Sequence, residues 1–369
     1  MRIVVSGGGT GGHIYPALAV CEALRNHDPE CELLYVGSTS GMEAQIVPAA
    51  GVPYQGVTAR KLRKLVSLST VAVAVSLIQG FREARRYLEA FKPAAVVGTG
   101  GYVAAAAALA AASMHIPVVI LAPDAIPGRT NLLLGRFARR ICVVFAGSVT
   151  RFPAGRAEVT GLPLRSGVVA PPDVSAAQAR ARFPGLETDR FTVLVIGGSQ
   201  GARAVNEIVV EALPDLIGAG MQVLHQTGPA NLASVEEAVR ALGLSGSVPH
   251  CPVAYLDEEQ VRLAYRAADV IVCRGGISTL SEVMVNGLPS VIVPLPSAYA
   301  DHQTANAQAL AAAGAALCYP EFDLHAEGLT LELTQLKDAP ERLVAMASAT
   351  RAMAQPDAAA RVANIVLNL

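Results

Sequence analysis

The sequence predicts an α/β fold with two doubly wound parallel sheets, and two observations support this prediction. Short apolar runs rich in β-branched residues alternate with helical patterns along the chain, as in parallel strands that are buried on both faces. A strand that enters a glycine-rich turn occurs twice, once near residue 7 and again near residue 197. With 369 residues, the chain is long for one core and comfortable for two domains.

The predicted strands form two series. The first series covers residues 3–5, 32–36, 95–97, 118–121 and 141–144. The second series covers residues 192–196, 222–226, 270–273, 290–293 and 315–318. A Gly/Pro turn follows the first series, so we expect the chain to divide there into domains of residues 1–163 and 164–355. The last helical pattern, residues 356–369, is expected to pack back on the first domain.

Composition excludes some classes of function. The 29 basic and 30 acidic residues nearly cancel, so no overall field selects for nucleic acid. Charged residues make up 16% of the chain and the mean hydropathy is +0.41, which indicates buried sheets or a lipid-facing surface. Six scattered cysteines without a CxxC pair are typical of reduced thiols in the cytosol rather than of disulfides or a zinc site.

One apolar stretch needs a separate explanation. Residues 102–122 carry no charge and are long enough for a membrane-spanning helix. Most of them are alanine, however, and Pro117 divides the stretch. We therefore predict a buried helix near residues 103–113, then a strand, and no transmembrane span. Because the glycine turn begins at residue 7, we expect no signal peptide.

The first glycine turn, Gly-Gly-Gly-Thr-Gly-Gly-His at residues 7–13, separates a strand from an apolar helix. Glycines let backbone N–H groups approach a phosphate or sugar, and a helix N-terminus favours negative charge. His13 adds a titratable imidazole at the same place. The turn therefore predicts a site for an anionic or polyhydroxyl ligand beside a proton-transfer group. A nicotinamide dinucleotide is disfavoured, because the second strand ends in Gly37 and Ser38 without an acidic residue.

Five motifs occur in order: Gly-Gly-Thr-Gly-Gly-His-Ile-Tyr-Pro-Ala at residues 8–17, Gly-Thr-Gly-Gly-Tyr-Val at 98–103, Gly-Gly-Ser-Gln-Gly-Ala-Arg at 197–203, Cys-Arg-Gly-Gly at 273–276 with Ser-Glu at 281–282, and Asp-His-Gln-Thr-Ala-Asn-Ala at 301–307. Together they closely resemble the MurG family of N-acetylglucosaminyltransferases, from residue 1 to about residue 365. The resemblance implies a GT-B fold, in which two Rossmann-like domains face one another across a cleft. It also implies an inverting hexosyltransferase that moves N-acetylglucosamine from UDP-N-acetylglucosamine to lipid I, giving lipid II in peptidoglycan synthesis.

The resemblance further implies where the protein works and with what. The N-terminal domain would face the acceptor and the membrane, and the C-terminal domain would bind the UDP sugar. The enzyme would be a peripheral protein on the cytoplasmic face of the cell membrane and would serve cell-wall biogenesis, and through it cell shape, the cell cycle and cell division. Its partners would be UDP-N-acetylglucosamine, lipid I (undecaprenyl-pyrophosphoryl-N-acetylmuramyl-pentapeptide) and an anionic membrane surface, with no nucleic acid. The chain has no Asp-x-Asp, so no metal site and no tightly bound cofactor are expected, although a divalent cation in solution remains compatible.

Carried over residue by residue, the resemblance assigns donor-side roles. Arg165 and Ser199 would lie near the donor phosphates and Leu256 against uracil. Glu282 would bind the ribose hydroxyls and Gln303 the sugar hydroxyls. The full donor-side set is Thr10, Gly11, Gly12, Asp124, Arg165, Ser199, Gln200, Leu256, Ile277, Ser278, Thr279, Leu280, Ser281, Glu282 and Gln303. Two alternatives stay open: Glu282 as a helix N-terminal carboxylate with a dipole role, and Arg165 as a partner in a linker salt bridge.

His13 is the candidate catalytic residue on the acceptor side. As general base it would take the proton from the acceptor hydroxyl. The alternative is that His13 orients the loop or hydrogen-bonds the pyrophosphate of lipid I. The second motif supplies Gly98, Gly100, Gly101 and Tyr102 to the same side.

A basic cluster precedes an apolar helical pattern, and the residues concerned are Arg60, Lys61, Arg63, Lys64, Leu68, Leu77, Ile78 and Phe81. Such a segment binds anionic headgroups and shallow acyl chains in peripheral membrane proteins. The alternative is an ordinary packed helix beside a solvated basic loop. The lipid-linked acceptor of the family favours the membrane interpretation.

The chain departs from the MurG pattern at three places. Residues 121–124 read Leu-Ala-Pro-Asp where the family usually has His-Glu-Gln-Asn, Leu162 replaces an asparagine, and Gly275 stands where a serine is common. Asp124 accepts hydrogen bonds but does not donate them when ionised. Three rival functions therefore stay open: a related enzyme with another lipid acceptor such as diacylglycerol, a UDP-N-acetylglucosamine 2-epimerase, and a non-enzymatic sugar-nucleotide sensor.

Overall fold

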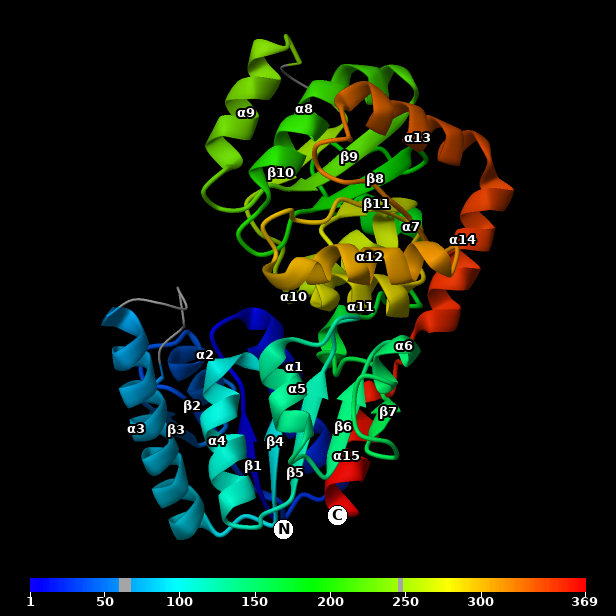
Figure 1. Cartoon of the computed structure of the whole chain (residues 1–369). Helices are drawn as coiled ribbons and strands as arrows, with labels where there is room; N and C mark the ends of the chain where they lie inside the picture. The colour runs from blue at the N-terminus through cyan, green and yellow to red at the C-terminus, as the bar shows by residue number, and fades with distance from the viewer. Residues whose placement is uncertain (60–67, 245–247) are drawn as a thin grey trace. The chain divides into compact units, whose positions relative to one another are not determined.

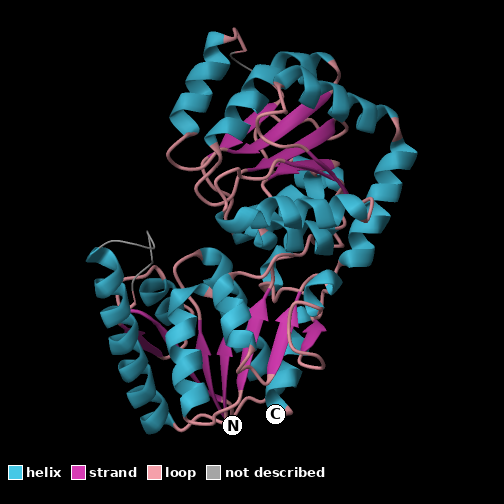
Figure 2. Ribbon diagram, viewed as in Figure 1, coloured by secondary structure: helices cyan, strands magenta, loops and turns pink. Residues whose placement is uncertain are grey.

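A computed structural model describes residues 1–59, 68–244 and 248–369 of the chain. They form two compact units, unit 1 with residues 1–165 and 355–369 and unit 2 with residues 166–354. The first boundary lies two residues beyond the expected one, so Arg165, which the sequence analysis put in the second domain, belongs to unit 1. Figure 2 shows that helices cover both faces of the sheet in each unit.

The strands of unit 1 are β1 Arg2–Ser6, β2 Glu32–Ser38, β3 Tyr54–Val57, β4 Ala95–Gly98, β5 Val118–Ala122, β6 Arg140–Val143 and β7 Ala157–Val159. They form a parallel sheet in the order β3-β2-β1-β4-β5-β6-β7. The direction of winding reverses between β1 and β4. In a doubly wound sheet this is the place where the loops after the strands separate and leave a crevice for a ligand.

The helices of unit 1 are α1 Gly11–His27, α2 Glu43–Ala49, α3 Leu68–Phe91, α4 Gly101–Ser113, α5 Arg129–Gly135, α6 Ala146–Val149 and α15 Ala358–Leu367. Strand side chains alternate between the two faces of the sheet, so the helices form two layers. Val4 faces a core shared with α3, α4 and α5, whereas Ile3 and Val5 face a core shared with α1, α2 and α15 (Figure 1).

The apolar stretch at residues 102–122 is mostly buried in unit 1 and does not form one long helix. It forms most of the buried, alanine-rich helix α4 and then strand β5, as the sequence predicted. In the described part of the chain, no helix is long and apolar enough to cross a bilayer. The last helix, α15, packs on α1 through Val362, Ala363 and Val366 and so belongs to the core of unit 1.

Unit 2 contains β8 Phe191–Ile196, β9 Met221–Gln226, β10 His250–Val253, β11 Val270–Cys273, β12 Ser290–Ile292 and β13 Ala316–Cys318. The sheet order is β10-β9-β8-β11-β12-β13, again parallel, with the reversal between β8 and β11. The helices are η1 Ser166–Val168, α7 Ala176–Arg180, α8 Arg203–Gly218, α9 Leu232–Ala241, α10 Glu258–Ala267, α11 Ile277–Asn286, η2 Tyr299–Asp301, α12 His302–Ala312, α13 Ala326–Asp338 and α14 Pro340–Met353.

Three strands were not predicted, namely β3, β7 and β10, and all three lie at a sheet edge. An edge strand has a neighbour on one side alone and is less deeply buried, so its sequence lacks a continuous apolar run. The burial patterns agree: β3 and β7 are mostly half-buried, and β10 contains His250 and Pro252. The apolar runs therefore located the central strands and one edge strand, β13, and missed the other three edges.

Two buried histidines form a hydrogen-bonded chain in unit 2. His250 Nε2 lies 3.4 Å from His225 Nδ1, and His225 Nε2 lies 3.0 Å from Asn206 Oδ1. The Asn206 amide nitrogen donates to the Thr227 carbonyl, so its oxygen accepts and His225 Nε2 carries the proton. Burial lowers the pKa of His225 to about 3 and the pKa of His250 to about 4.

We predict that acid destabilises the protein through these two imidazoles. Because both folded-state pKa values lie below the ordinary value of about 6.5, the unfolded chain binds more protons, and the free energy of unfolding falls as the pH drops from about 6.5 toward 4. His250→Gln should flatten this loss by up to about 1.4 kcal/mol per pH unit in urea unfolding. His27→Gln, which alters an exposed histidine, is the control. Equal slopes for wild type and His250→Gln would contradict the prediction.

Candidate active site

The carboxyl ends of β1 and β4 bring two glycine turns together in unit 1. The strands pair directly, with Ser6 beside Gly98, so the turn at residues 7–12 lies next to the loop at residues 99–101. A Cβ added at Gly7 would lie 2.0 Å from the Thr99 hydroxyl oxygen. The two turns therefore pack in direct contact at the point where the winding of the sheet reverses.

At two positions of the second loop, Gly100 and Gly101, no residue other than glycine fits this contact. Gly100 has φ +114° and Gly101 has φ +80°, which L side chains rarely adopt. An added Cβ would lie 2.6 Å from His13 Nδ1 at Gly100 and 2.4 Å from the Gly8 carbonyl oxygen at Gly101. The loop from β4 can thus contact the first turn and His13 because it carries no side chains there.

The backbone of this loop fixes the tautomer of His13. His13 lies in the first turn of α1, with Nδ1 3.2 Å from the Thr99 carbonyl oxygen. A carbonyl accepts, so Nδ1 carries the proton and the lone pair of the neutral ring lies on Nε2. The Thr99 hydroxyl donates to the His13 carbonyl at 2.7 Å and ties the same two segments a second time. The arrangement suits a general base whose Nε2 accepts a proton.

A buried carboxylate that was not among the predicted site residues, Glu43, hydrogen-bonds to the backbone of the first turn. Glu43 is fully buried, and its oxygens accept hydrogen bonds from the N–H groups of Gly9 at 3.2 Å and Ser38 at 3.0 Å. The Tyr35 hydroxyl donates to the Gly7 carbonyl at 2.9 Å. The second strand ends without an acid at Gly37 and Ser38. Glu43 lies five residues after Ser38, at the start of α2.

The other predicted residues of unit 1 surround this centre. The Tyr102 ring packs on Gly9, and burial raises the pKa of its hydroxyl. Asp124 follows β5 and is half-buried. The Arg165 guanidinium lies over the Tyr15 ring of α1, 4.3 Å from the ring centre, which is a cation–π contact. Arg165 therefore lies beside the first turn of α1 rather than in unit 2 with Ser199.

Unit 2 gathers the remaining predicted residues at the carboxyl edge of its own sheet. The turn with Ser199 and Gln200 follows β8, and both residues are exposed. The helix with Glu282, α11, follows β11, the strand next to β8. The Glu282 carboxylate accepts a hydrogen bond of 2.6 Å from the Tyr265 hydroxyl of α10. This pairing orients a partly exposed carboxylate at the reversal point of the second sheet.

The first turn of α11 contains five more of the predicted residues. Ser278 and Thr279 are half-buried, whereas Ile277, Leu280 and Ser281 are buried. The Ser281 hydroxyl has no hydrogen-bond partner among the residues that the structure describes. The buried members support the helix from its inner face, and Ser278 and Thr279 reach its surface.

Leu256 lies just before α10 and Gln303 lies in α12, and both helices contact α11. Leu256 is buried just before Asp257, which begins α10 with a capping box to Gln260. The Gln303 side-chain oxygen accepts from the Leu295 N–H at 3.0 Å, so its amide nitrogen is the end that donates to other groups. A Cβ at Gly275 would lie 2.4 Å from the Gln303 carbonyl oxygen, which explains the glycine at this position.

The segment predicted to contact a membrane is partly described. Arg60, Lys61, Arg63 and Lys64 lie outside the described residues, as does the side chain of Leu68. Leu77 and Ile78 of α3 are 42% and 55% exposed, whereas Phe81 packs on the core. Two of the predicted apolar contacts therefore point to solvent.

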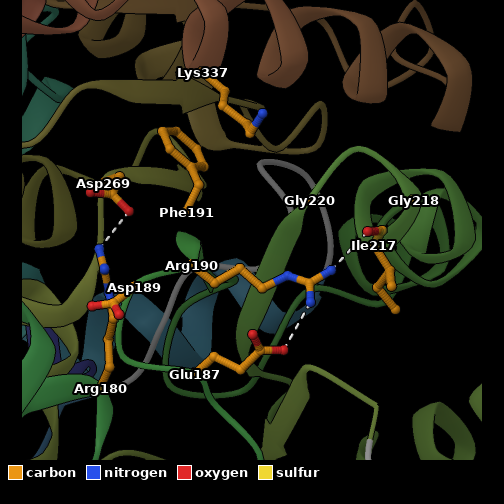
Figure 3. A pocket seen from close by; sticks show the side chains of 10 residues that line it. All are labelled: Arg180, Glu187, Asp189, Arg190, Phe191, Ile217, Gly218, Gly220, Asp269 and Lys337. Carbon is orange, nitrogen blue, oxygen red and sulfur yellow. Dashed lines mark hydrogen bonds and ion pairs between the residues drawn. The ribbon is translucent and has the colours of Figure 1, made fainter.

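A pocket at the opposite edge of the unit 2 sheet is not part of this site. It lies at the amino ends of β8, β9 and β11, and its arginines are paired: Arg180 with Asp269 at 2.6 Å and Arg190 with Glu187 at 2.9 Å (Figure 3). These charges largely cancel, so the pocket offers no net charge to an anion. Among the described residues, no cluster of three or more His, Cys, Asp or Glu side chains could hold a metal ion.

Models of glycosyltransferase family 28 match both parts of the chain, the N-terminal domain at residues 3–143 and the C-terminal domain at residues 192–362. The UDP-N-acetylglucosamine–N-acetylmuramyl-(pentapeptide) pyrophosphoryl-undecaprenol N-acetylglucosamine transferase of Desulfitobacterium hafniense is 39% identical over 100% of this chain and 99% of its own length.

Solved structures are similar over the whole chain as well. MurG of Acinetobacter baumannii has a TM-score of 0.80 at 30% identity, covering 100% of this chain and 99% of its own. The UDP-GlcNAc 2-epimerase of Neisseria meningitidis, bound to UDP-GlcNAc, has a TM-score of 0.70 and covers 100% of both chains at 16% identity. At that identity the second likeness shows the shared fold alone.

We predict that Glu43→Gln destabilises unit 1. The new amide group presents N–H to a backbone N–H, so one buried hydrogen bond is lost, and the free energy of unfolding should fall by about 1–3 kcal/mol in urea unfolding. Glu22→Gln changes an exposed glutamate of α1 and serves as the control, with an expected change within about 0.5 kcal/mol. A similar loss in both variants would show that the contacts of Glu43 with the glycine turn are unimportant for stability.

Proposed function

The chain belongs to glycosyltransferase family 28 and, within it, to the MurG family, and on this basis we propose that it transfers N-acetylglucosamine from UDP-N-acetylglucosamine to lipid I with inversion. The product is lipid II, the precursor used in peptidoglycan synthesis. The full-length match to a transferase of this activity supports the proposal. The two reversal points, each with a glycine turn and polar side chains, agree with one unit for each substrate.

The single observation that carries the mechanism is the 3.2 Å contact of His13 Nδ1 with the Thr99 carbonyl oxygen, from which the tautomer follows. With Nδ1 donating to the Thr99 carbonyl, Nε2 accepts the proton of the acceptor hydroxyl as its oxygen attacks the anomeric carbon. The bond from the anomeric carbon to the UDP oxygen breaks on the opposite face, which inverts the configuration. Thr10, Gly11 and Gly12 lie at the N-terminus of α1, where developing or resident negative charge is favoured.

Unit 2 holds the donor in this proposal. Glu282, oriented by Tyr265, accepts from the two ribose hydroxyls, and Gln303 donates from its amide to the sugar hydroxyls. Ser199 and Gln200 lie in the turn before α8, whose N-terminus favours the departing diphosphate. No tightly bound cofactor is part of the proposal, and a divalent cation in solution would pair with the same diphosphate charge.

Unit 1 holds the acceptor. Gly98, Gly100, Gly101 and Tyr102 border the turn with His13. The Arg165 fork, which the resemblance assigns to the donor phosphates, lies beside α1 in this unit and suits an anionic group. Asp124 at the end of β5 accepts hydrogen bonds from sugar hydroxyls or amides. This departure from the family pattern bears on which hydroxyls are recognised, so diacylglycerol or another lipid acceptor is the rival outcome of the test.

We also propose that unit 1 rests on the cytoplasmic face of the membrane. Helices α3 and α5 both pack on α4 (Figure 1). Both carry exposed apolar side chains: Leu77 and Ile78 on α3, and Leu132 and Leu133 on α5. Phe137, just after α5, is 54% exposed. Exposed apolar side chains are unfavourable in water and favourable among acyl chains. Work at this surface would link the enzyme to cell-wall growth, cell shape and cell division.

We predict that His13→Ala lowers acceptor-dependent release of UDP by about 10²-fold or more, because the acceptor hydroxyl loses its base. The measurement is release of UDP from UDP-N-acetylglucosamine with and without a lipid I analogue. His27→Ala, at the exposed end of the same helix, should keep wild-type turnover. Turnover of His13→Ala within threefold of wild type would reject the base role. Tight donor binding without any release, or conversion at C2 of the sugar without acceptor, would point to the sensor or the epimerase.

We predict that Leu77→Ser together with Ile78→Ser weakens binding to vesicles that contain anionic phospholipid. Each change removes an exposed apolar side chain that would enter the interface, so the fraction that sediments with vesicles should fall at least about threefold. A matched pair of changes at exposed apolar residues of unit 2, Leu331→Ser with Val344→Ser, should leave it unchanged. Equal sedimentation of the first pair and the wild type would reject the proposed surface.

A further inference from the structure

We propose that Gln226 is a positioning residue of the donor pocket: its side-chain amide clamps the segment on the diphosphate side to the segment on the uracil side. This inference rests on the proposed function, since it assumes that unit 2 binds the UDP part of the donor. Gln226 is not one of the residues to which the resemblance assigns a role.

The sheet topology puts Gln226 between the two segments. It is the last residue of β9, which lies between β8 and β10 in the sheet. The glycine turn with Gly198 follows β8, and the loop with Leu256 follows β10. A side chain at the end of the middle strand can therefore reach the loops that leave both of its neighbours.

Both polar atoms of the Gln226 side-chain amide make hydrogen bonds. Its Nε2 donates to the Gly198 carbonyl at 3.2 Å, and its Oε1 accepts from the Leu256 N–H at 3.2 Å. One partner can only accept and the other can only donate, so the orientation of the amide is determined. The side chain is 4% exposed and acts through these two backbone groups rather than on a ligand.

Both partners belong to segments that the donor would contact. Gly198 has φ +92° in the turn that leads to Ser199 and Gln200. Leu256 directly precedes the cap of α10, the helix whose Tyr265 holds Glu282. Loss of the clamp lets the diphosphate side and the uracil side move relative to each other. A ligand that spans both sides then loses more affinity than one that contacts a single side.

The same strand offers a matched control. Gln222 of β9 is fully buried, its Nε2 donates to the Glu187 carbonyl at 2.7 Å, and its Oε1 accepts from the Glu187 N–H at 2.7 Å. It is thus a second buried amide that clamps backbone. It lies near the amino end of the strand. Its partner Glu187 lines the pocket shown in Figure 3. A purely structural effect of losing a buried amide should appear equally in both variants.

The test compares Gln226→Met and Gln222→Met, which keep the side-chain length and remove the amide. Binding of UDP and of uridine alone is measured by calorimetry on the full-length protein, together with thermal unfolding and the donor KM and kcat. We expect both variants to lose stability. In Gln226→Met the Kd for UDP and the donor KM should rise about tenfold, with kcat at saturating donor within about twofold of wild type. Its Kd for uridine should rise by less than about threefold, and Gln222→Met should keep its UDP Kd within about twofold.

Three results would overturn the inference: an unchanged UDP Kd in Gln226→Met, an equal loss in Gln222→Met, or a loss for uridine as large as that for UDP. In each of these cases the proposed function is still supported if the wild-type protein binds UDP. Failure of the wild-type protein to bind UDP would overturn the proposed function and the inference together.

Discussion

The close contact between the two glycine turns of unit 1 is the constraint on which its site depends. The turn after β1 and the loop after β4 are in direct contact because glycines leave the room, since a Cβ at Gly100 would meet the His13 ring and one at Gly101 would meet the Gly8 carbonyl. This contact lets the Thr99 carbonyl reach Nδ1 of His13 and so determine which ring nitrogen accepts a proton. The buried carboxylate of Glu43 then holds the first turn from the other side.

The two units support their glycine turns with side chains of opposite hydrogen-bonding sense. In unit 1 the Glu43 carboxylate accepts from a backbone N–H of the turn, whereas in unit 2 the Gln226 amide donates to a backbone carbonyl. A side chain that donates to a backbone carbonyl occupies none of the N–H groups of the turn. These N–H groups are the ones that stabilise an anion. The neutral clamp therefore suits the turn that we propose to face the diphosphate.

Sequence reasoning located the central strands and both glycine turns, because buried parallel strands read as continuous apolar runs and glycine turns as short motifs. It missed β3, β7 and β10, whose edge positions leave them partly exposed and mixed in composition. It also put Arg165 in the second domain, whereas the guanidinium lies on Tyr15 of unit 1. A single half-buried arginine at a domain boundary carries no pattern from which its packing partner can be predicted.

The sequence by itself determined the α/β class, the order of the two glycine-turn domains and the residues that could do chemistry, since each of these depends on local pattern and residue type. The tertiary structure alone decided how Glu43 and Gln226 act. Glu43 lies 34 residues from Gly9 and Gln226 lies 28 residues from Gly198, and each reaches its turn because β2 pairs with β1 and β9 pairs with β8. Long-range hydrogen bonds of this kind leave no periodic signal, because strand order is set by packing over the whole sheet.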